Sequence, residues 1–265
     1  MTFPVEFHLL GRAIPAHVLF ELIGYSGAFQ IYLLRRRREH AASSIDAETH
    51  VWLIAGAILG ALVGAKLLAI VESFPQYWQH RDNPIIWAEG KTIVGGLLGG
   101  WIGVEIAKKF RSVHGSSGDA YVPALLFGIA VGRIGCFLTG LPDHTYGNHT
   151  SLPWSVDFGD GPRHPTQLYE IAALLLIAVI LAVRARQPFA RGELFRLFLL
   201  LYLAFRFLVE FIKPTYHPYL GLSAIQLASL LGVVVCAWRI RTMAARRKSS
   251  SEGAVHEPTA ISAPG

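Results

Sequence analysis

The sequence predicts an all-α integral membrane protein with seven transmembrane helices, its N-terminus outside and its C-terminus in the cytoplasm. Of its 265 residues, 52% are hydrophobic and only 16% are charged, whereas roughly a quarter are charged in a typical soluble domain. The mean hydropathy is +0.42. The apolar residues also fall in runs of about 20, the length that a helix needs to cross a bilayer. A soluble enzyme is therefore not expected.

The predicted spans cover residues 15–34, 51–71, 92–107, 121–141, 165–183, 193–212 and 223–240. The third is short, as expected of a tilted or partly re-entrant helix. Arg35 to Arg38 follow the first span directly, and basic residues concentrate on the cytoplasmic side of membrane proteins. Most other basic residues outside the spans fall in loops that this orientation also places inside. The formal charge of +6 therefore reflects orientation, and no nucleic-acid partner is expected.

We predict one membrane domain over residues 1–243, with an outer cap loop at about 141–165. Residues 1–14 lack the basic start and apolar core of a signal peptide. Residues 244–265 are polar and rich in small side chains, which predicts a disordered cytoplasmic tail. The function is therefore expected in the helices and their outer loops.

Glycines recur every four positions in three of the predicted spans, a spacing that lets helix backbones approach closely. Close packing without chemistry is the simpler interpretation. In the third span, the run GGLLGG would also expose the backbone N–H groups of Gly95 and Gly96 to a passing lipid headgroup. The repeats are Gly56, Gly60 and Gly64; Gly95, Gly99 and Gly103; and Gly128 and Gly132.

The fourth, fifth and sixth predicted spans contribute ionisable residues at similar depth, and a charge inside the bilayer costs at least about 2.5–3.5 kcal/mol. Arg133 lies in GRIGCFLTG, Glu170 in RHPTQLYE, and Arg206 and Glu210 in FRFLVEF, four residues apart on one helix face. One interpretation is that Arg133–Glu170 and Arg206–Glu210 are neutralising pairs that fix helix packing. The other is an outward-facing pocket whose arginines bind the phosphate of a lipid headgroup, since guanidinium groups suit phosphate.

The two cysteines, Cys136 and Cys236, both lie in apolar runs, from which we expect neither a disulfide framework nor a thiolate zinc site. Cys136 follows Arg133 by three residues, so it is either a packing residue or a thiol activated by a guanidinium. The outer loop contains several aspartates and histidines without His-x-His or Asp-x-Asp spacing. No metal site is therefore expected there.

The segments GGLLGG, GRIGCFLTG, RHPTQLYE and FRFLVEF, in this order and followed by Gln226 in LSAIQ, resemble the bacterial prolipoprotein diacylglyceryl transferases. RHPTQLYE is the most specific of them. The resemblance implies a multi-pass protein of the bacterial plasma (inner) membrane. It also implies transfer of a diacylglyceryl group from phosphatidylglycerol to the lipobox cysteine of a prolipoprotein, with release of glycerol phosphate. No cofactor or metal is implied; the partners would be phosphatidylglycerol, other membrane lipid and the prolipoprotein signal peptide.

The resemblance also implies roles for individual residues. Arg133 and Arg206 would hold the phosphate, and Glu210 would orient Arg206. Arg163 and His164 would lie at the outer mouth, with His164 as the base for the acceptor thiol. The implied catalytic residues are Arg206, His164, Glu210 and Arg163, and the implied substrate-binding residues are Arg133, Gly95, Gly96, Cys136, Glu170, Gln167 and Tyr169.

The chain departs from the family pattern at several polar positions. Val94 stands where the family usually has a histidine, Cys136 replaces an asparagine, and Phe20 aligns with a tyrosine. Three functions therefore remain open. The first is a lipoprotein transferase with a rearranged site. The second is a related transferase with another acceptor, with Cys136 as its nucleophile. The third is a non-catalytic lipid-binding or lipid-transporting protein, although no inverted repeat typical of transporters is visible.

Overall fold

The structure, a computed structural model, describes residues 3–9, 11–40, 46–83, 87, 90–113 and 115–255, and it is mostly helical. Short 3₁₀ turns η1 (Gly118–Tyr121), η2 (Leu141–Asp143) and η3 (Glu210–Ile212) adjoin the longer helices. Two small antiparallel sheets pair β1 (Glu6–Leu9) with β2 (Arg12–Pro15) and β3 (Val156–Asp157) with β4 (Pro162–Arg163). The helices are α1 (Ala16–His40), α2 (Ala47–Glu72), α3 (Phe74–Gln79), α5 (Ile93–Phe110), α6 (Val122–Thr139), α7 (Thr166–Arg184), α8 (Glu193–Val209) and α9 (Ala224–Val255).

Each predicted span coincides with one long helix. Within the described residues, four segments are long and apolar enough to cross a membrane: Ala47–Glu72, Gly118–Thr139, Thr166–Arg184 and Ala224–Ala245. The other three predicted spans correspond to α1, α5 and α8. Of these, α8 has only 17 residues, and α5 carries charged residues toward its C-terminal end. The fold is thus that of a helical membrane protein, while the count of seven spans and their orientation remain predictions.

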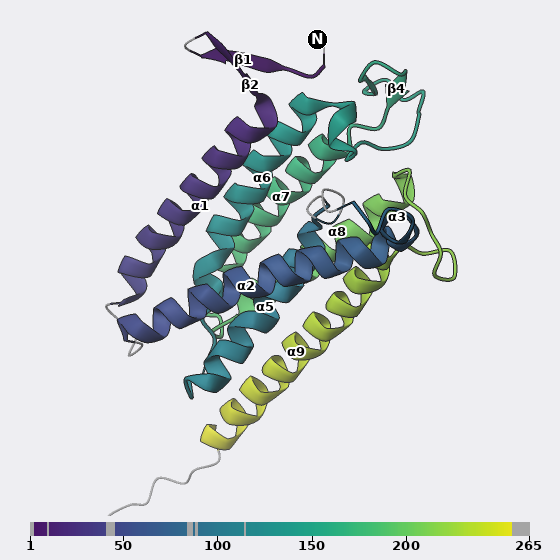
Figure 1. The fold of residues 1–265 in the computed structure, drawn as a ribbon. Coiled ribbons are helices and arrows are strands. Elements are labelled where there is room, and N and C mark those ends of the chain that lie inside the picture. Colours follow the sequence, from purple (N-terminus) through teal and green to yellow (C-terminus); the bar gives the residue numbers. More distant parts are fainter. Residues whose placement is uncertain are drawn as a thin grey trace, which may run out of the picture.

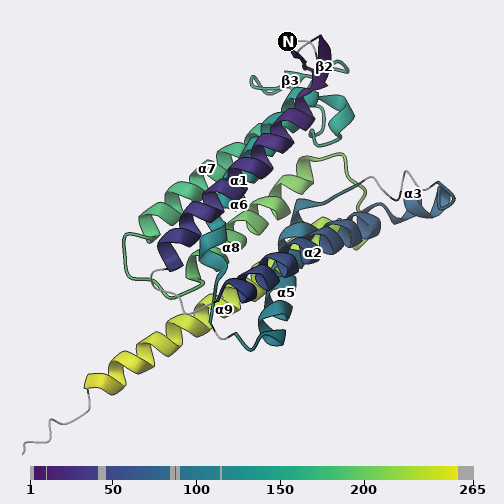
Figure 2. The same cartoon turned by 60° about the vertical axis from the view of Figure 1, so that its left-hand side comes forward.

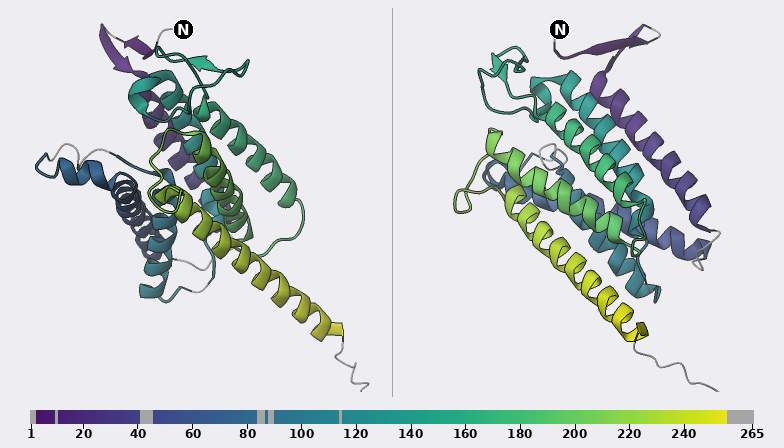
Figure 3. Two further views of the ribbon diagram at one scale, coloured as in Figure 1. Left: turned by 90° about the vertical axis from the view of Figure 1, so that its right-hand side faces the viewer. Right: turned by 180° about the vertical axis from the view of Figure 1, so that it is seen from behind.

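The helices form two packed groups joined through α8. Helices α1, α6 and α7 lie side by side, α8 packs against α7 and α9, and the α2–α5 hairpin lies against α9 (Figure 1). Figure 2 and Figure 3 show the same grouping from other directions. The β1–β2 hairpin and the loop with β4 lie at one end of the bundle, and the C-terminal end of α9 lies at the other. The buried core centres on α8, where Phe198, Leu199, Tyr202 and Leu203 are fully buried.

Large apolar side chains also cover the outside of the bundle. Leu62 on α2, Leu175 on α7 and Leu231 on α9 are 63%, 62% and 65% exposed. An apolar exterior of this extent is typical of a membrane-facing surface.

Glycines allow the backbones of α2 and α5 to contact each other directly. A β-carbon on Gly60 would collide with the carbonyl oxygen of Gly99, and one on Gly56 would lie 2.6 Å from that of Gly103. The predicted close packing is confirmed for these two helices. Gly132 on α6 is different, since a β-carbon there would meet nothing within 4 Å.

The C-terminal helix extends further than expected. Helix α9 continues to Val255, so the backbone is helical in part of the tail that we expected to be disordered from residue 244. The extension includes several alanine, arginine and lysine residues, which are strong helix formers. Residues 256–265 lie outside the described part of the chain.

Candidate functional site

Four ionisable side chains from α6, α7, α8 and η3 form one buried cluster. A single carboxylate oxygen, Oε2 of Glu170, lies 2.9 Å from Arg133 Nε and 3.4 Å from Arg206 Nη1. Arg206 Nη2 lies 2.9 Å from Glu210 Oε2. Both predicted pairs therefore form, and Glu170 joins them. Because two cations face two anions, the cost of burying each charge is largely offset.

The cluster is almost inaccessible. Arg133 is 7% exposed, Arg206 4%, Glu170 2% and Glu210 0%. Tyr202, which the sequence analysis missed, donates a 2.6 Å hydrogen bond from its hydroxyl to Glu170 Oε1. Tyr202 lies four residues before Arg206, on the same helix face, and this spacing could have indicated that it belongs to the cluster.

Several polar atoms in and beside this cluster have unused hydrogen-bonding capacity. Among the described residues, Arg206 Nε, Glu210 Oε1 and both amide atoms of Gln167 are buried without a hydrogen-bond partner. Gln167 is 1% exposed and precedes Glu170 by one helical turn. Unsatisfied buried polar atoms cost roughly 1–3 kcal/mol each. A polar group that reached the cluster could use this hydrogen-bonding capacity.

Arg163 and His164 belong to a separate group in the cap loop. Arg163 binds Asp160 through Nε, 2.8 Å from Oδ1, and through Nη2, 2.6 Å from Oδ2. This bond lowers the pKa of the Asp160 carboxyl and raises that of Arg163. The Arg163 guanidinium also lies 4.6 Å from the centre of the Tyr146 ring. In this structure Arg163 is therefore engaged with its own loop.

His164 contacts a tyrosine at the start of α7. Its Nδ1 lies 3.1 Å from the hydroxyl of Tyr169, which accepts a 2.8 Å hydrogen bond from Trp154 Nε1. In the described residues, no side-chain hydrogen bond or ion pair connects Arg163, His164 or Tyr169 to the buried cluster. The structure therefore divides the predicted catalytic residues between two places.

Lys213, one residue past η3, is a second residue that the sequence analysis did not place in the site. Burial, reinforced by the charge of Arg206, lowers its pKa to about 8. It adds a weakly basic amine beside the buried arginines.

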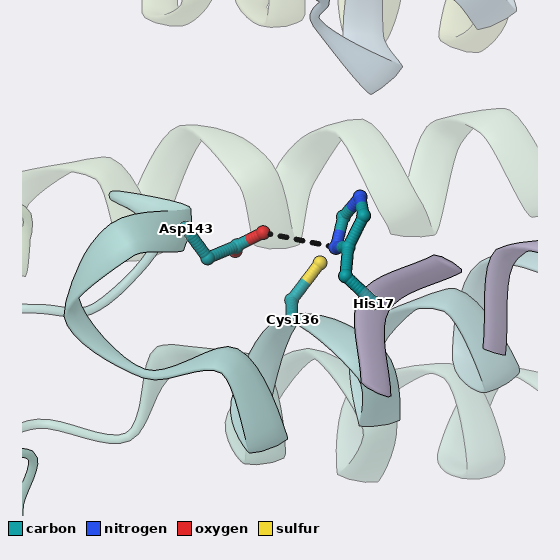
Figure 4. Close-up of side chains that lie close together, drawn as sticks. All are labelled: His17, Cys136 and Asp143. Atoms are coloured by element: carbon teal, nitrogen blue, oxygen red, sulfur yellow. Dashed lines mark ion pairs between the residues drawn. The ribbon is translucent and has the colours of Figure 1, made fainter. Parts of the chain in front are cut away.

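Cys136 joins the buried cluster to a further group of side chains. Arg133 Nη1 lies 3.6 Å from Cys136 Sγ, as the three-residue spacing suggested. Cys136 also meets His17 from the start of α1 and Asp143 from η2, and the three side chains point toward one another (Figure 4). His17 Nδ1 lies 3.3 Å from Asp143 Oδ1. We expected no metal from the spacings within the loop, and no local spacing in the sequence connects these three residues.

Gly95 and Gly96 differ from the prediction. The Gly95 N–H donates to Thr92 Oγ1 at 3.2 Å, and the Gly96 N–H donates to the Thr92 carbonyl at 3.0 Å. The prediction that these N–H groups are exposed is wrong, because Thr92 caps the helix at this point.

Gly96 instead lines a cavity of about 130 Å³ between α2, α5, α6 and α8. None of the four buried-cluster residues lines this cavity. It includes Arg196 from the first turn of α8, whereas Arg206 lies in the last turn.

The comparisons with known proteins agree with one another. A family model described as prolipoprotein diacylglyceryl transferase matches residues 4–242. The chain is 33% identical over 257 residues to a phosphatidylglycerol–prolipoprotein diacylglyceryl transferase of Cupriavidus metallidurans, covering 90% of this chain and 93% of the relative. Proteins with the same name from Bordetella parapertussis and Aliivibrio salmonicida are 33% and 30% identical. They cover 83% and 79% of this chain, and 86% and 75% of the relatives' lengths.

Proposed function

Because the chain belongs to the prolipoprotein diacylglyceryl transferase family, we propose that it is a transferase of lipoprotein biosynthesis. It moves the diacylglyceryl group of phosphatidylglycerol to the thiol of a lipobox cysteine in a prolipoprotein. The observation that carries this proposal is the family match over residues 4–242. The buried pair of arginines that share Glu170 supplies a phosphate-binding element that the reaction requires.

The proposed placement is a multi-pass protein of the bacterial inner membrane, with seven spans and the N-terminus outside. The seven long helices and the basic residues after α1 support this orientation. It puts the cap loop and the nearby ends of α6, α7 and α8 on the outer side, where a secreted prolipoprotein arrives.

Arg133 and Arg206 are the proposed phosphate ligands. Without substrate, Glu170 compensates both guanidinium groups. A lipid phosphate would enter as a further anion and accept hydrogen bonds from donors such as the unpartnered Arg206 Nε. Glu210, 2.9 Å from Arg206 Nη2, would hold that guanidinium in orientation. As the carbon–oxygen bond breaks, the same arginines would stabilise the charge that develops on glycerol phosphate.

His164 is the proposed base for the acceptor thiol. Its contact with Tyr169 fixes the ring, which leaves the other ring nitrogen to take the proton. The thiolate then attacks the glyceryl carbon, and glycerol phosphate leaves with the electrons of the broken bond. We assign Arg163 to shaping the mouth, and Gln167, Tyr169 and Cys136 to the substrate path.

The test is a direct transfer assay. The purified chain is incubated with phosphatidylglycerol in detergent and a lipobox peptide, and the peptide is weighed by mass spectrometry. We expect a gain of one diacylglyceryl group. No gain, while the relative from Cupriavidus metallidurans modifies the same peptide, would overturn the proposed acceptor. Release of glycerol phosphate without peptide modification would point to another acceptor.

Matched variants test the phosphate ligands. Arg206→Gln should abolish the product, whereas Arg184→Gln should retain it. Arg184 also pairs with a carboxylate, that of Glu193, but it lies at the end of α7 remote from the buried cluster. Equal activity of the two variants would reject the assignment of Arg206.

A further inference from the structure

Three different donor atoms meet at the outer end of α1 and α6. The ligand atoms of His17, Cys136 and Asp143 all lie within 4.8 Å of one another. The nitrogen and the carboxylate oxygen, His17 Nδ1 and Asp143 Oδ1, are already 3.3 Å apart. Nitrogen, sulfur and carboxylate oxygen are the three donor types that zinc takes in proteins.

The spacing is close to that of a tetrahedral zinc site. Bonds of about 2.0–2.3 Å at tetrahedral angles put neighbouring ligand atoms roughly 3.3–3.6 Å apart. The nitrogen–oxygen distance meets this range as it stands. The sulfur lies within 4.8 Å of both of these atoms, so it would have to approach them by up to about 1.2 Å to reach the tetrahedral spacing.

Each of the three side chains has a further polar group close to it. His17 Nε2 lies 3.7 Å from Glu21 Oε2, one helical turn along α1. Asp143 Oδ2 accepts a hydrogen bond from the hydroxyl of Thr145, and Cys136 receives Arg133. Supporting contacts of this kind, a carboxylate on the far nitrogen of the histidine above all, orient metal ligands.

One atom of this group, His17 Nδ1, lacks a hydrogen-bond partner among the described residues. His17 Nδ1 is buried and makes no hydrogen bond of acceptable geometry within the described part of the chain, despite its 3.3 Å approach to Asp143. A cation between the nitrogen, the oxygen and the sulfur would supply the partner that His17 Nδ1 lacks among the residues that the structure describes. With the thiol and the carboxylate ionised, the two negative charges of these ligands would also balance the charge of a divalent ion.

We propose that His17, Cys136 and Asp143 bind one zinc ion, and that its open fourth position takes the acceptor thiol. The site has three protein ligands, the number typical of catalytic zinc, rather than four as in structural sites. The side chain of His17 is 38% exposed, so solvent reaches the edge of the site at the end of the bundle that carries the cap loop, while His17 Nδ1 itself is buried.

The role of the fourth position rests on the proposed function. Zinc deprotonates a coordinated thiol, and the proton passes to His164 directly or through water. The zinc-held sulfur attacks the glyceryl carbon of phosphatidylglycerol, the carbon–oxygen bond to the phosphate breaks, and glycerol phosphate leaves with the electron pair. Zinc keeps its oxidation state, so no redox partner is needed. Arg133, which contacts both Cys136 and Glu170, would place the lipid phosphate next to this sulfur.

The first experiment measures metal binding without turnover. The full chain, purified in detergent without a histidine tag, is analysed for metal content, stripped with a chelator and titrated with Co²⁺. We expect about one zinc per chain, together with the visible spectrum of tetrahedral Co²⁺ and a near-ultraviolet sulfur-to-cobalt band. Cys136→Ser should remove the sulfur band, and His17→Gln or Asp143→Asn should weaken binding at least about tenfold.

Cys236→Ala is the matched control, since Cys236 is the other cysteine, buried on α9. It should keep the full spectrum, and circular dichroism should show native helix content for every variant. Absence of Co²⁺ binding, or a sulfur band that persists in Cys136→Ser, would overturn the site.

The second experiment tests the fourth position. Adding a lipobox peptide to the Co²⁺ form should strengthen the sulfur-to-cobalt band, and the same peptide with serine in place of cysteine should not. An unchanged band would overturn thiol binding at the metal. This spectrum needs no catalysis, so it separates failure of the metal proposal from failure of the proposed transferase activity.

Discussion

The carboxylate of Glu170 contacts Arg133, Arg206 and Tyr202, which makes Glu170→Gln an informative perturbation. Glutamine keeps the shape of the side chain and can still accept the hydrogen bond from Tyr202. It removes the negative charge that lies between Arg133 and Arg206. Two buried guanidinium groups would then face Glu210 alone. We expect this single-atom change to be strongly destabilising.

The magnitude follows from burial. Removing one partner of a buried ion pair typically costs about 3–5 kcal/mol, because the remaining charge stays buried without compensation. Every member of this cluster is at most 7% exposed, so the full range applies. At 1.4 kcal/mol per factor of ten, the folded-to-unfolded ratio should fall by two to nearly four orders of magnitude. Adding Arg133→Met to Glu170→Gln should recover part of this loss, since the second change removes one uncompensated cation.

The assay is unfolding of the purified protein in mixed detergent micelles, followed by far-ultraviolet circular dichroism. Asp160→Asn is the matched control, because the Asp160 side chain is 36% exposed where it pairs with Arg163. Exposed pairs contribute about 0–1 kcal/mol. A Glu170→Gln protein that unfolds within about 1 kcal/mol of wild type would refute the view that this carboxylate compensates the buried arginines.

Three further predictions concern packing and protonation. Gly60→Ala should destabilise the α2–α5 contact, because its β-carbon would collide with Gly99. Gly132→Ala should be neutral or stabilise the protein by up to about 1 kcal/mol. Equal unfolding midpoints of the two variants would contradict this. Lys213, whose pKa is lowered to about 8, should be half neutral near pH 8. Labelling of this amine by an amine-reactive reagent, measured by mass spectrometry, should therefore rise through that pH. A rise only above about pH 10, as for an ordinary lysine, would contradict the lowered pKa. His164→Ala should slow transfer most near neutral pH, where the acceptor thiol is still protonated, and less above about pH 8.5; rate profiles that stay parallel to wild type would remove His164 as the base.

Much of the helical frame could be predicted from the sequence, because apolar runs of spanning length have few alternatives to a helix. The Arg206–Glu210 pair was predictable from its four-residue spacing. The Arg133–Glu170 pair followed from the need of two charges at similar depth to compensate one another. That one oxygen of Glu170 serves both arginines could not be predicted, since it depends on how three helices rotate about their axes.

The group of His17, Cys136 and Asp143 shows what sequence reasoning missed. Its members come from the first helix, the end of α6 and the following turn, so no local spacing signals their meeting. Tyr202 was missed for another reason: a tyrosine in an apolar run is typical of a core residue, and only its partner gives it a polar role. The prediction that Gly95 and Gly96 expose their N–H groups was wrong because Thr92, an ordinary capping residue, accepts hydrogen bonds from both.

The contact of α2 with α5 has a consequence for biosynthesis. The interface is made of backbone atoms from residues 56–64 and 95–103 of one continuous stretch, so it needs no side chain from α6 to α9. The pair can therefore assemble as a hairpin while the later helices are still being translated. Only 6% of the residues in the apolar segment of α2 are buried in the finished bundle, and most of the contacts of α2 are with α5, so they would form at this early stage. A substitution of one of these glycines should therefore lower the yield of inserted protein in cells more than it lowers the activity of the protein that does fold.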